Sequence, residues 1–302
     1  FATVADKRRL ETVRIDQTDL DSVRKASNEI HHLVDSIDVL INNAGIHYSK
    51  GFLLDRAPTT PQGYDTSFVV NYLSHVLLTE LLMDLLVAPS SSSMKGVVLQ
   101  MTSSFHWAVD GSDLWPAGDS KADDVESFPL AAQPGGLEGI WRDQRAYANS
   151  KLAQILHARA LARQYDSVAV VNVCPGWVAT QIANKLTLPV LHSLAFPMMG
   201  WGVASTIVAL MDPSRTSAKD FYINTLVPEV AGSAPSMFHA AWFASWGFRD
   251  AVLCFCSGLM IVLQKWFPAA QPGTSSPESF QQPLQDSLYT WSLQQLQEWM
   301  LA

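Results

Sequence analysis

A tyrosine and a lysine four residues apart are the strongest candidates for chemistry in this sequence. Tyr147 and Lys151 lie in the stretch Tyr147-Ala148-Asn149-Ser150-Lys151, and a spacing of four places both side chains on one face of a helix. A free phenol has a pKa of about 10, and a nearby ammonium group lowers that pKa because it stabilises the phenolate. A tyrosine tuned in this way can exchange a proton with an alcohol oxygen near neutral pH. Taken alone, such a pair is more often an ordinary feature of an amphipathic helix, so the rest of the chain has to decide.

The hydrophobic pattern on either side of this pair predicts strands alternating with helices. Short apolar, β-branched runs predict strands at residues 10–15, 37–41, 96–101, 168–173 and 221–223. Apolar residues at helical spacing predict helices at residues 19–35, 62–86, 147–163 and 286–301. Residues 105–145 are predicted to be a long irregular segment. The alternation predicts an α/β fold with a doubly wound, Rossmann-like parallel sheet.

Turn-forming and polar residues follow the predicted strands. They are Asp16, the run Asn42-Asn43-Ala44-Gly45, the pair Ser103 and Ser104, and the segment from Pro175 to Thr180. In sheets of this kind, ligands bind outside the carboxyl ends of the strands. We therefore expect these separate segments to form a single binding rim.

Composition narrows the classes of function. The net charge of the 302 residues is −8 and no long basic run occurs, which argues against a nucleic-acid partner. The three cysteines have no spacing suited to zinc, and the acidic residues between 110 and 126 have no calcium-loop spacing, so we predict no metal site. Reduced thiols favour an intracellular protein, either cytoplasmic or membrane-associated.

Taken together and in order, these residues resemble the short-chain dehydrogenase/reductase family. The matching set is Asp16, Asn42-Asn43-Ala44-Gly45, Asn71, Ser104, Tyr147-x-x-x-Lys151, and Pro175-Gly176 with Thr180. The resemblance covers residues 8–224 and a stretch near the C-terminus. Within the family it is strongest to the retinol dehydrogenase branch, through residues 62–65, residues 103–106 and the long segment before Tyr147.

The resemblance implies four catalytic residues. Tyr147 would be the general acid or base on the substrate oxygen, and Lys151 would hold the nicotinamide ribose and lower the Tyr147 pKa. Ser104 would bind the substrate oxygen, and it is preferred to Ser103 because the serine of the family is the second of such a pair. Asn71 would orient a water molecule that relays protons through Lys151. His106 is another possible base, although a loop or core histidine is the simpler interpretation.

The resemblance also implies a nicotinamide cofactor, NADP or NAD, and residues that contact it. Asp16 would accept a hydrogen bond from the adenine amine, and Asn43, Ala44 and Gly45 would pack against the adenosine side. The nicotinamide would be lined by Pro175, Gly176, Val178 and Thr180. The substrate would be a lipophilic alcohol or ketone, of retinoid, steroid or lipid type.

One family motif is missing from these 302 residues. The family opens with T-G-x-x-x-G-x-G, whose backbone amides hold the cofactor pyrophosphate, and no such motif occurs here. We therefore expect an N-terminally truncated sheet that lacks its first two strands and the Gly-rich turn. The basic or acidic residue that would select NADP or NAD lies in that missing part. The alternative to an oxidoreductase is a catalytically inactive fragment, or a binding or interaction protein, that retains the fold.

The expected organisation has three parts. Residues 1–230 form the truncated dehydrogenase domain with a substrate-binding segment at 181–212, and residues 232–270 are an apolar insertion. Residues 271–302 are a linker and a C-terminal helix of the same domain. Within the insertion, Arg249 and Asp250 divide the apolar residues 237–267 into pieces shorter than the roughly 20 residues a membrane span needs. We predict monotopic membrane association or a buried helical pair there, and a homodimer is a further possibility.

Overall fold

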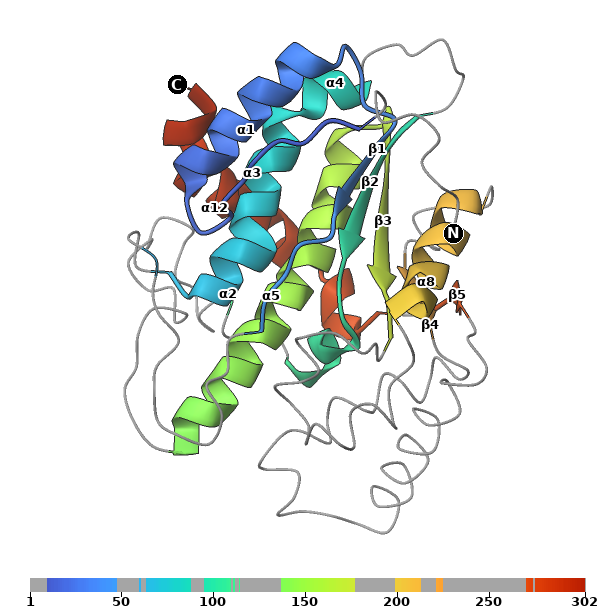
Figure 1. The fold of residues 1–302 in the computed structure, drawn as a ribbon. Helices are drawn as coiled ribbons and strands as arrows, with labels where there is room; N and C mark the ends of the chain where they lie inside the picture. The colour runs from blue at the N-terminus through green and yellow to red at the C-terminus, as the bar shows by residue number, and fades with distance from the viewer. Residues whose placement is uncertain are drawn as a thin grey trace.

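A five-stranded sheet forms the centre of the structure, which is a computed structural model. It describes residues 10–47, 60, 64–87, 95–109, 111, 114, 137–176, 199–212, 221–224, 270–273 and 275–301. In spatial order, the strands are β1 (Val39–Asn42), β2 (Gly96–Met101), β3 (Val168–Cys174), β4 (Phe221–Asn224) and β5 (Ala270–Pro272). The first four strands pair in parallel and β5 pairs antiparallel to β4 (Figure 1). The predicted α/β, Rossmann-like parallel sheet is confirmed.

Helices cover both faces of this sheet. They are α1 (Leu20–Leu33), α2 (Thr66–Phe68), α3 (Ser74–Leu81), α4 (Met83–Val87), α5 (Leu137–Gln164), α8 (Met199–Met211) and α12 (Gln282–Leu301). Figure 1 shows α5 with α1, α3 and α12 on one side of the sheet and α8 on the other. A π-helical turn (Val69–Leu73) joins α2 to α3, and short 3₁₀ helices occupy Ser104–Ala108 and Pro277–Phe280.

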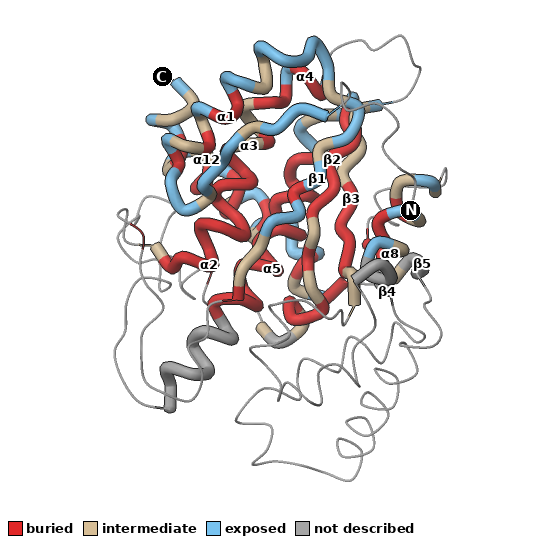
Figure 2. The backbone as a smooth tube through the Cα atoms, viewed as in Figure 1, coloured by how far each residue is buried: buried red, intermediate tan, exposed pale blue. Residues whose placement is uncertain are grey.

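The main core lies between α5 and the helices packed over it. The apolar stripe of α5, including Leu152 and Leu156, is fully buried against Tyr72 of the π-helical turn and Leu288 of α12. This burial appears in Figure 2 as continuous red along α2 and much of α5. Because a large buried side chain contributes roughly 1.5–3 kcal/mol, α5 is a firm platform for whatever side chains it carries.

The structure differs from the prediction at residues 10–15 and in residues 105–145. Residues 10–15 are not a strand: Leu10 and Ile15 are exposed, and no described strand lies beside them to supply a ladder of hydrogen bonds. The segment instead runs outside the sheet into α1 (Figure 1). The irregular segment predicted for residues 105–145 also ends early, because α5 begins at Leu137.

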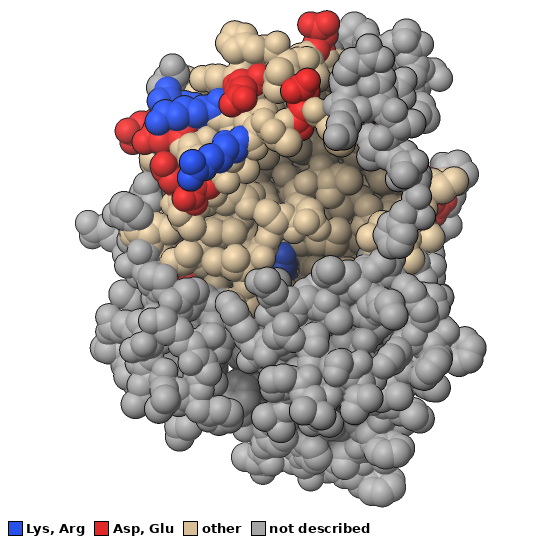
Figure 3. Space-filling view, in the orientation of Figure 1, with Lys and Arg blue, Asp and Glu red and all other residues tan. Residues whose placement is uncertain are grey.

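One face of the molecule has an uneven distribution of charge. Figure 3 shows that the described charged side chains gather towards the end where α1 lies, whereas the hollowed middle of the face is mainly uncharged. Val39 and Ile41 of β1 are 39% and 43% exposed. The outer side of β1 is therefore much less covered than β2 and β3.

The predicted membrane-associated segment, residues 237–267, lies outside the described residues. Of the predicted substrate-binding segment, 181–212, the structure describes only residues 199–212, which include α8. Among the described helices, none is both long enough and apolar enough to cross a bilayer.

Candidate active site

The parallel strands bring the predicted rim segments to the same edge of the sheet. In register, Asn42 lies opposite Gln100, and Gln100 lies opposite Asn172. The segments that begin after β1, β2 and β3 therefore start side by side. These are residues 43–47, 102–104 and 175–176.

Tyr147 and Lys151 reach this edge from α5, and both are buried. The Lys151 Nζ donates to the carbonyl oxygen of Met101 at 2.9 Å and to Gln154 Oε1 at 3.0 Å. Met101 is the last residue of β2, so Lys151 ties α5 to the end of that strand. The same ammonium nitrogen lies 5.7 Å from the centre of the Tyr147 ring.

Asn71 fastens the segment after β1 to α5. Its Oδ1 accepts from the Ile46 amide at 2.7 Å, and its Nδ2 donates to the Ile46 carbonyl at 2.9 Å and to Ser150 Oγ at 3.0 Å. Asn71 lies in the π-helical turn, and such turns inside helices often occur at functional sites. The unfavourable asparagine in a helix interior is thus explained by three specific hydrogen bonds.

The two adjacent serines after β2 point to different partners. The Ser103 side chain forms a hydrogen bond with Tyr147, whereas the Ser104 side chain forms one with the Cys174 thiol. Ser103 Oγ also accepts from the Phe105 amide at 3.3 Å and so caps the following 3₁₀ helix. Of the two hydroxyls, Ser103 is the one that bonds to Tyr147, whereas the resemblance named Ser104.

Burial dominates the protonation of the pair on α5. It raises the pKa of Tyr147 to about 12 against a smaller opposing effect of the Ser103 hydrogen bond, and it lowers the pKa of Lys151 to about 7. The expected lowering of the Tyr147 pKa by Lys151 is therefore not what this arrangement produces. The reason is that desolvation disfavours the charged form of both groups.

Two aromatic side chains to which the sequence assigned no role pack against Tyr147. The rings of His47 and Phe105 pack edge-on against it, with centroid distances of 4.9 and 5.6 Å. His47 is buried and lies two residues beyond Gly45 on the rim. Its position after the Asn42–Gly45 run was the only available signal, and the pattern alone gave no reason to expect a contact with Tyr147.

Comparison with known proteins places this geometry in a family. A family model described as short chain dehydrogenase matches residues 2–109. Retinol dehydrogenase 14 of Homo sapiens is 33% identical over 229 residues, which are 74% of this chain and 56% of that protein. Its Mus musculus counterpart is 32% identical over 197 residues, 64% of this chain and 49% of that protein. The chain belongs to the short-chain dehydrogenase/reductase family.

The similarity to the two retinol dehydrogenases confirms the predicted resemblance to that branch. The chain spans about half the length of these two relatives. A solved structure from Mycobacterium paratuberculosis has the same fold, with a TM-score of 0.54 and 20% identity over 93% of this chain and 73% of that one. Family membership supports the use of a nicotinamide cofactor, NADP or NAD.

Gly45 allows the rim segment after β1 to approach Asn71 and Lys151 closely. A Cβ built on Gly45 would lie 3.3 Å from Asn71 Oδ1 and 3.4 Å from Lys151 Nζ, so a side chain here would crowd both groups. Gly176, on the neighbouring rim segment, has a φ of 76°, a conformation that favours glycine. These residues, with the exposed Asn43 and Ala44, fit the surroundings of a cofactor.

Asp16 and the segment after β3 were also predicted to contact the cofactor. Asp16 is exposed, and its Oδ1 accepts from the Thr18 amide at 3.0 Å and the Thr18 hydroxyl at 2.7 Å. These bonds lower the Asp16 pKa and form a turn ahead of α1. Pro175 and Gly176 lie on the rim after β3, whereas Val178 and Thr180 lie outside the described residues.

Proposed function

We propose that this chain transfers a hydride between a nicotinamide cofactor and the carbonyl or hydroxyl carbon of a lipophilic molecule. The observation that carries the proposal is the convergence of Tyr147, Lys151, Asn71 and Gly45 at the carboxyl ends of the strands. The cofactor, when bound, supplies or accepts the hydride. The residues proposed to contact it are Tyr147 and Lys151 on α5, Asn43, Ala44 and Gly45 after β1, and Pro175 and Gly176 after β3. Asp16, Val178 and Thr180 are also proposed as contacts, as predicted from the resemblance.

Tyr147 is the proposed proton donor when the substrate is a carbonyl compound. With a pKa of about 12, its hydroxyl is protonated at neutral pH and able to give that proton to the substrate oxygen. Lys151 has a pKa of about 7 and therefore exchanges protons readily in the same range, which suits it to resupply Tyr147. The protonated state of Tyr147 at neutral pH therefore suits it to act as the acid when a carbonyl compound is reduced.

Ser103 is the proposed partner of the substrate oxygen beside Tyr147. Its side chain already forms a hydrogen bond with Tyr147, so an oxygen atom held by the tyrosine is also within its reach. Ser104 is the residue named from the resemblance, and its hydroxyl instead forms a hydrogen bond with the Cys174 thiol. Asn71 holds the rim segment through Ile46, and the proposed relay water would lie beside it.

Two observations support a lipophilic substrate. The relatives that match the chain include proteins named retinol dehydrogenase 14. In addition, α8, within the segment predicted to bind substrate, carries large exposed apolar side chains: Val203, Ile207 and Met211. An uncharged, extended molecule such as a retinoid, steroid or other lipid is the class of substrate we propose.

A second candidate is a protein that binds such molecules without turning them over. The same strand-end rim would hold a bound molecule whether or not a hydride is transferred. Cofactor binding and hydride transfer therefore have to be measured separately. Hydride transfer is measured at a high cofactor concentration, so that weak binding does not hide it.

The direct test is product formation by the purified chain. The chain is incubated with millimolar NADPH, or NADH, and retinal or a steroid ketone, and the alcohol is measured by chromatography. We expect alcohol from the wild type, a strong loss in Ser103→Ala and near-normal formation in Ser104→Ala. Absence of alcohol with every carbonyl compound would leave the binding protein as the better account.

A further inference from the structure

His106 lies between the loop that carries Ser103 and a segment 170 residues further along the chain. It is fully buried, and its Nδ1 donates to the Ser103 carbonyl oxygen at 2.6 Å. Its Nε2 accepts from the Ser276 amide at 3.0 Å. Since a carbonyl only accepts and an amide only donates, these two partners require the neutral ring with its proton on Nδ1. Burial lowers the His106 pKa to about 4, so this is the form at neutral pH.

The segment contacted by His106 is held at a second point by α5. Arg159 lies three helical turns beyond Tyr147 on that helix, and its guanidinium donates to Ser279 Oγ at 2.7 Å and to Ser275 Oγ at 2.9 Å. The guanidinium also stacks on Phe280 at 3.6 Å from the ring centre. Residues 275–280, called here the C-terminal clasp, are therefore fixed to the helix that carries Tyr147 and Lys151.

The loop held by His106 is in direct contact with Tyr147. Ser103 bonds to Tyr147 through its side chain, and the Phe105 ring packs edge-on against the tyrosine ring. The His106 amide also donates to the Ser103 carbonyl at 3.2 Å, so His106 holds this carbonyl with two donors. The His106 ring itself is packed against Phe221 of β4 with a centroid distance of 5.4 Å. A shift of His106 would therefore move Ser103 relative to Tyr147.

We infer that His106 is a positioning residue that fastens the Ser103 loop to the C-terminal clasp and so keeps Ser103 beside Tyr147. The clasp, far away in sequence, is then part of the active-site framework. The effect of His106 on catalysis rests on the proposed function. The link that His106 makes between the Ser103 loop and the C-terminal clasp does not.

Ser276 offers a substitution that breaks the link to His106. Its φ of −60° is compatible with proline, and Ser276→Pro replaces the amide hydrogen that His106 accepts with a ring carbon, so the hydrogen bond is lost and the two side chains are pushed apart. The carbonyl of residue 276, which accepts from Ser279, is retained. Ser276→Ala is the matched control, because it keeps the amide and removes a hydroxyl for which the described residues show no hydrogen-bond partner.

Hydrogen exchange of the backbone amides tests the link without any need for catalysis. In the 302-residue chain, Ser276→Pro should speed exchange at least tenfold in the peptide that covers residues 102–109, and Ser276→Ala should leave that peptide unchanged. Exchange at α1, which lies away from the clasp, reports whether the variant is still folded. If the residues 102–109 of a folded Ser276→Pro protein exchange as in the wild type, the inference is overturned.

Kinetics of the same variants test the positioning role. We expect kcat of Ser276→Pro to fall between about 10-fold and 100-fold with little change in KM, because a small misplacement acts on the reacting oxygen. His106→Asn retains a donor for Ser103 but cannot reach Ser276, so it should match Ser276→Pro, and the double variant should be no worse. Unchanged kcat with faster exchange would refute the positioning role. An inactive wild type would refute the proposed function, and the exchange result would still decide the link.

Discussion

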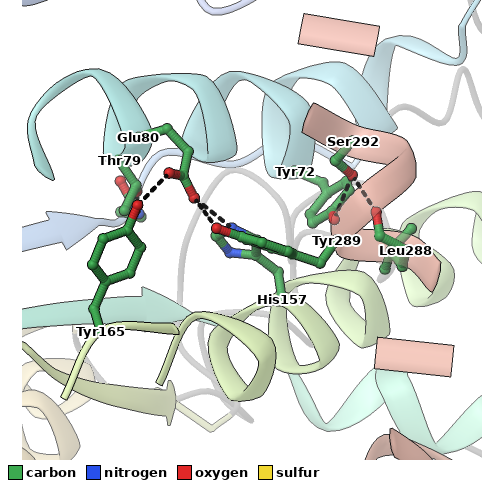
Figure 4. A network of polar contacts seen from close by, with 9 residues as sticks. Tyr72, Thr79, Glu80, His157, Tyr165, Leu288, Tyr289 and Ser292 are labelled. Carbon is green, nitrogen blue, oxygen red and sulfur yellow. Dashed lines mark hydrogen bonds and ion pairs between the residues drawn. The ribbon is translucent and has the colours of Figure 1, made fainter. Parts of the chain in front are cut away.

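Two buried clusters in this chain each place tyrosine hydroxyls next to ionisable side chains. The strand-end cluster consists of Tyr147, Lys151, Asn71 and Ser103. The interhelical cluster consists of Glu80, Tyr165, Tyr289 and His157 (Figure 4). In the second cluster, Glu80 accepts from Tyr289 at 3.0 Å and from Tyr165 at 3.3 Å, and His157 Nε2 lies 4.0 Å from it.

Shifted pKa values do not distinguish the two clusters. Burial raises the pKa of Tyr147 in one and of Tyr289 and Glu80 in the other. The surroundings differ: the first cluster adjoins the exposed rim at the ends of three strands, whereas Glu80 of α3, His157 of α5 and Tyr289 of α12 face one another between helices (Figure 4). A perturbed group therefore indicates a functional site only together with its position, and the interhelical cluster is a structural link between α12 and the core.

The largest expected difference between the clusters is in turnover. Tyr147→Phe removes the proposed proton donor and should lower kcat for carbonyl reduction by about 10³-fold, within the usual range for general acid catalysis. Tyr289→Phe deletes the same hydroxyl from the other cluster and should leave kcat within about twofold. Both rates are measured on protein shown to be folded by thermal unfolding. Equal losses in the two variants would remove the distinction between the clusters.

Substitutions in the interhelical cluster should lower stability without lowering kcat. Glu80→Ala leaves the partly buried hydroxyls of Tyr289 and Tyr165 without their acceptor, and a loss of this kind costs roughly 1–3 kcal/mol for a fully buried group. We expect the free energy of unfolding, measured in urea, to fall by about 2–4 kcal/mol, while the kcat of the folded fraction is unchanged. A large loss of kcat at constant stability would mean that the interhelical cluster takes part in catalysis.

A smaller effect is expected in the pH dependence of stability. Burial raises the pKa of Glu80 above its ordinary value of 4.5, so between pH 4.5 and the raised pKa the folded state binds more protons than the unfolded state. The contribution of Glu80 is then fully present below pH 4.5 and declines as the pH rises through the folded-state pKa. Relative to Glu80→Gln, the wild type should lose stability over that interval. A difference between the two proteins that stays constant from pH 4 to pH 8 would contradict the raised pKa.

The sequence was most informative where one short-range pattern determines the structure. The apolar stripe after Tyr147 predicted the buried face of α5, and the run at residues 96–101 predicted β2 with its observed bounds. The turn residues after successive strands predicted the rim, because parallel pairing brings those ends together. The run at residues 10–15 failed as a strand because strand formation depends on a neighbour, which the run itself does not specify.

Other features depend on contacts that sequence does not display. Ser103 and Ser104 are the same residue type, and only the direction of the backbone after β2 decides which hydroxyl meets Tyr147. The role of His106 requires Ser276, 170 positions away. The Tyr147 pKa follows from how deeply α5 is buried, which the Tyr–Lys spacing alone does not reveal.

The central claim is that the strand-end cluster holds the nicotinamide end of a cofactor, and saturation-transfer NMR measures this directly even when binding is weak. Millimolar NADPH is added to the wild type, to Lys151→Met and to Arg163→Met, which removes a cation from the same helix where it pairs with Asp286. We predict transfer to the nicotinamide and its ribose protons in the wild type and in Arg163→Met, and its loss in Lys151→Met. Equal transfer in all three proteins, or none to the nicotinamide protons of the wild type, would contradict the account.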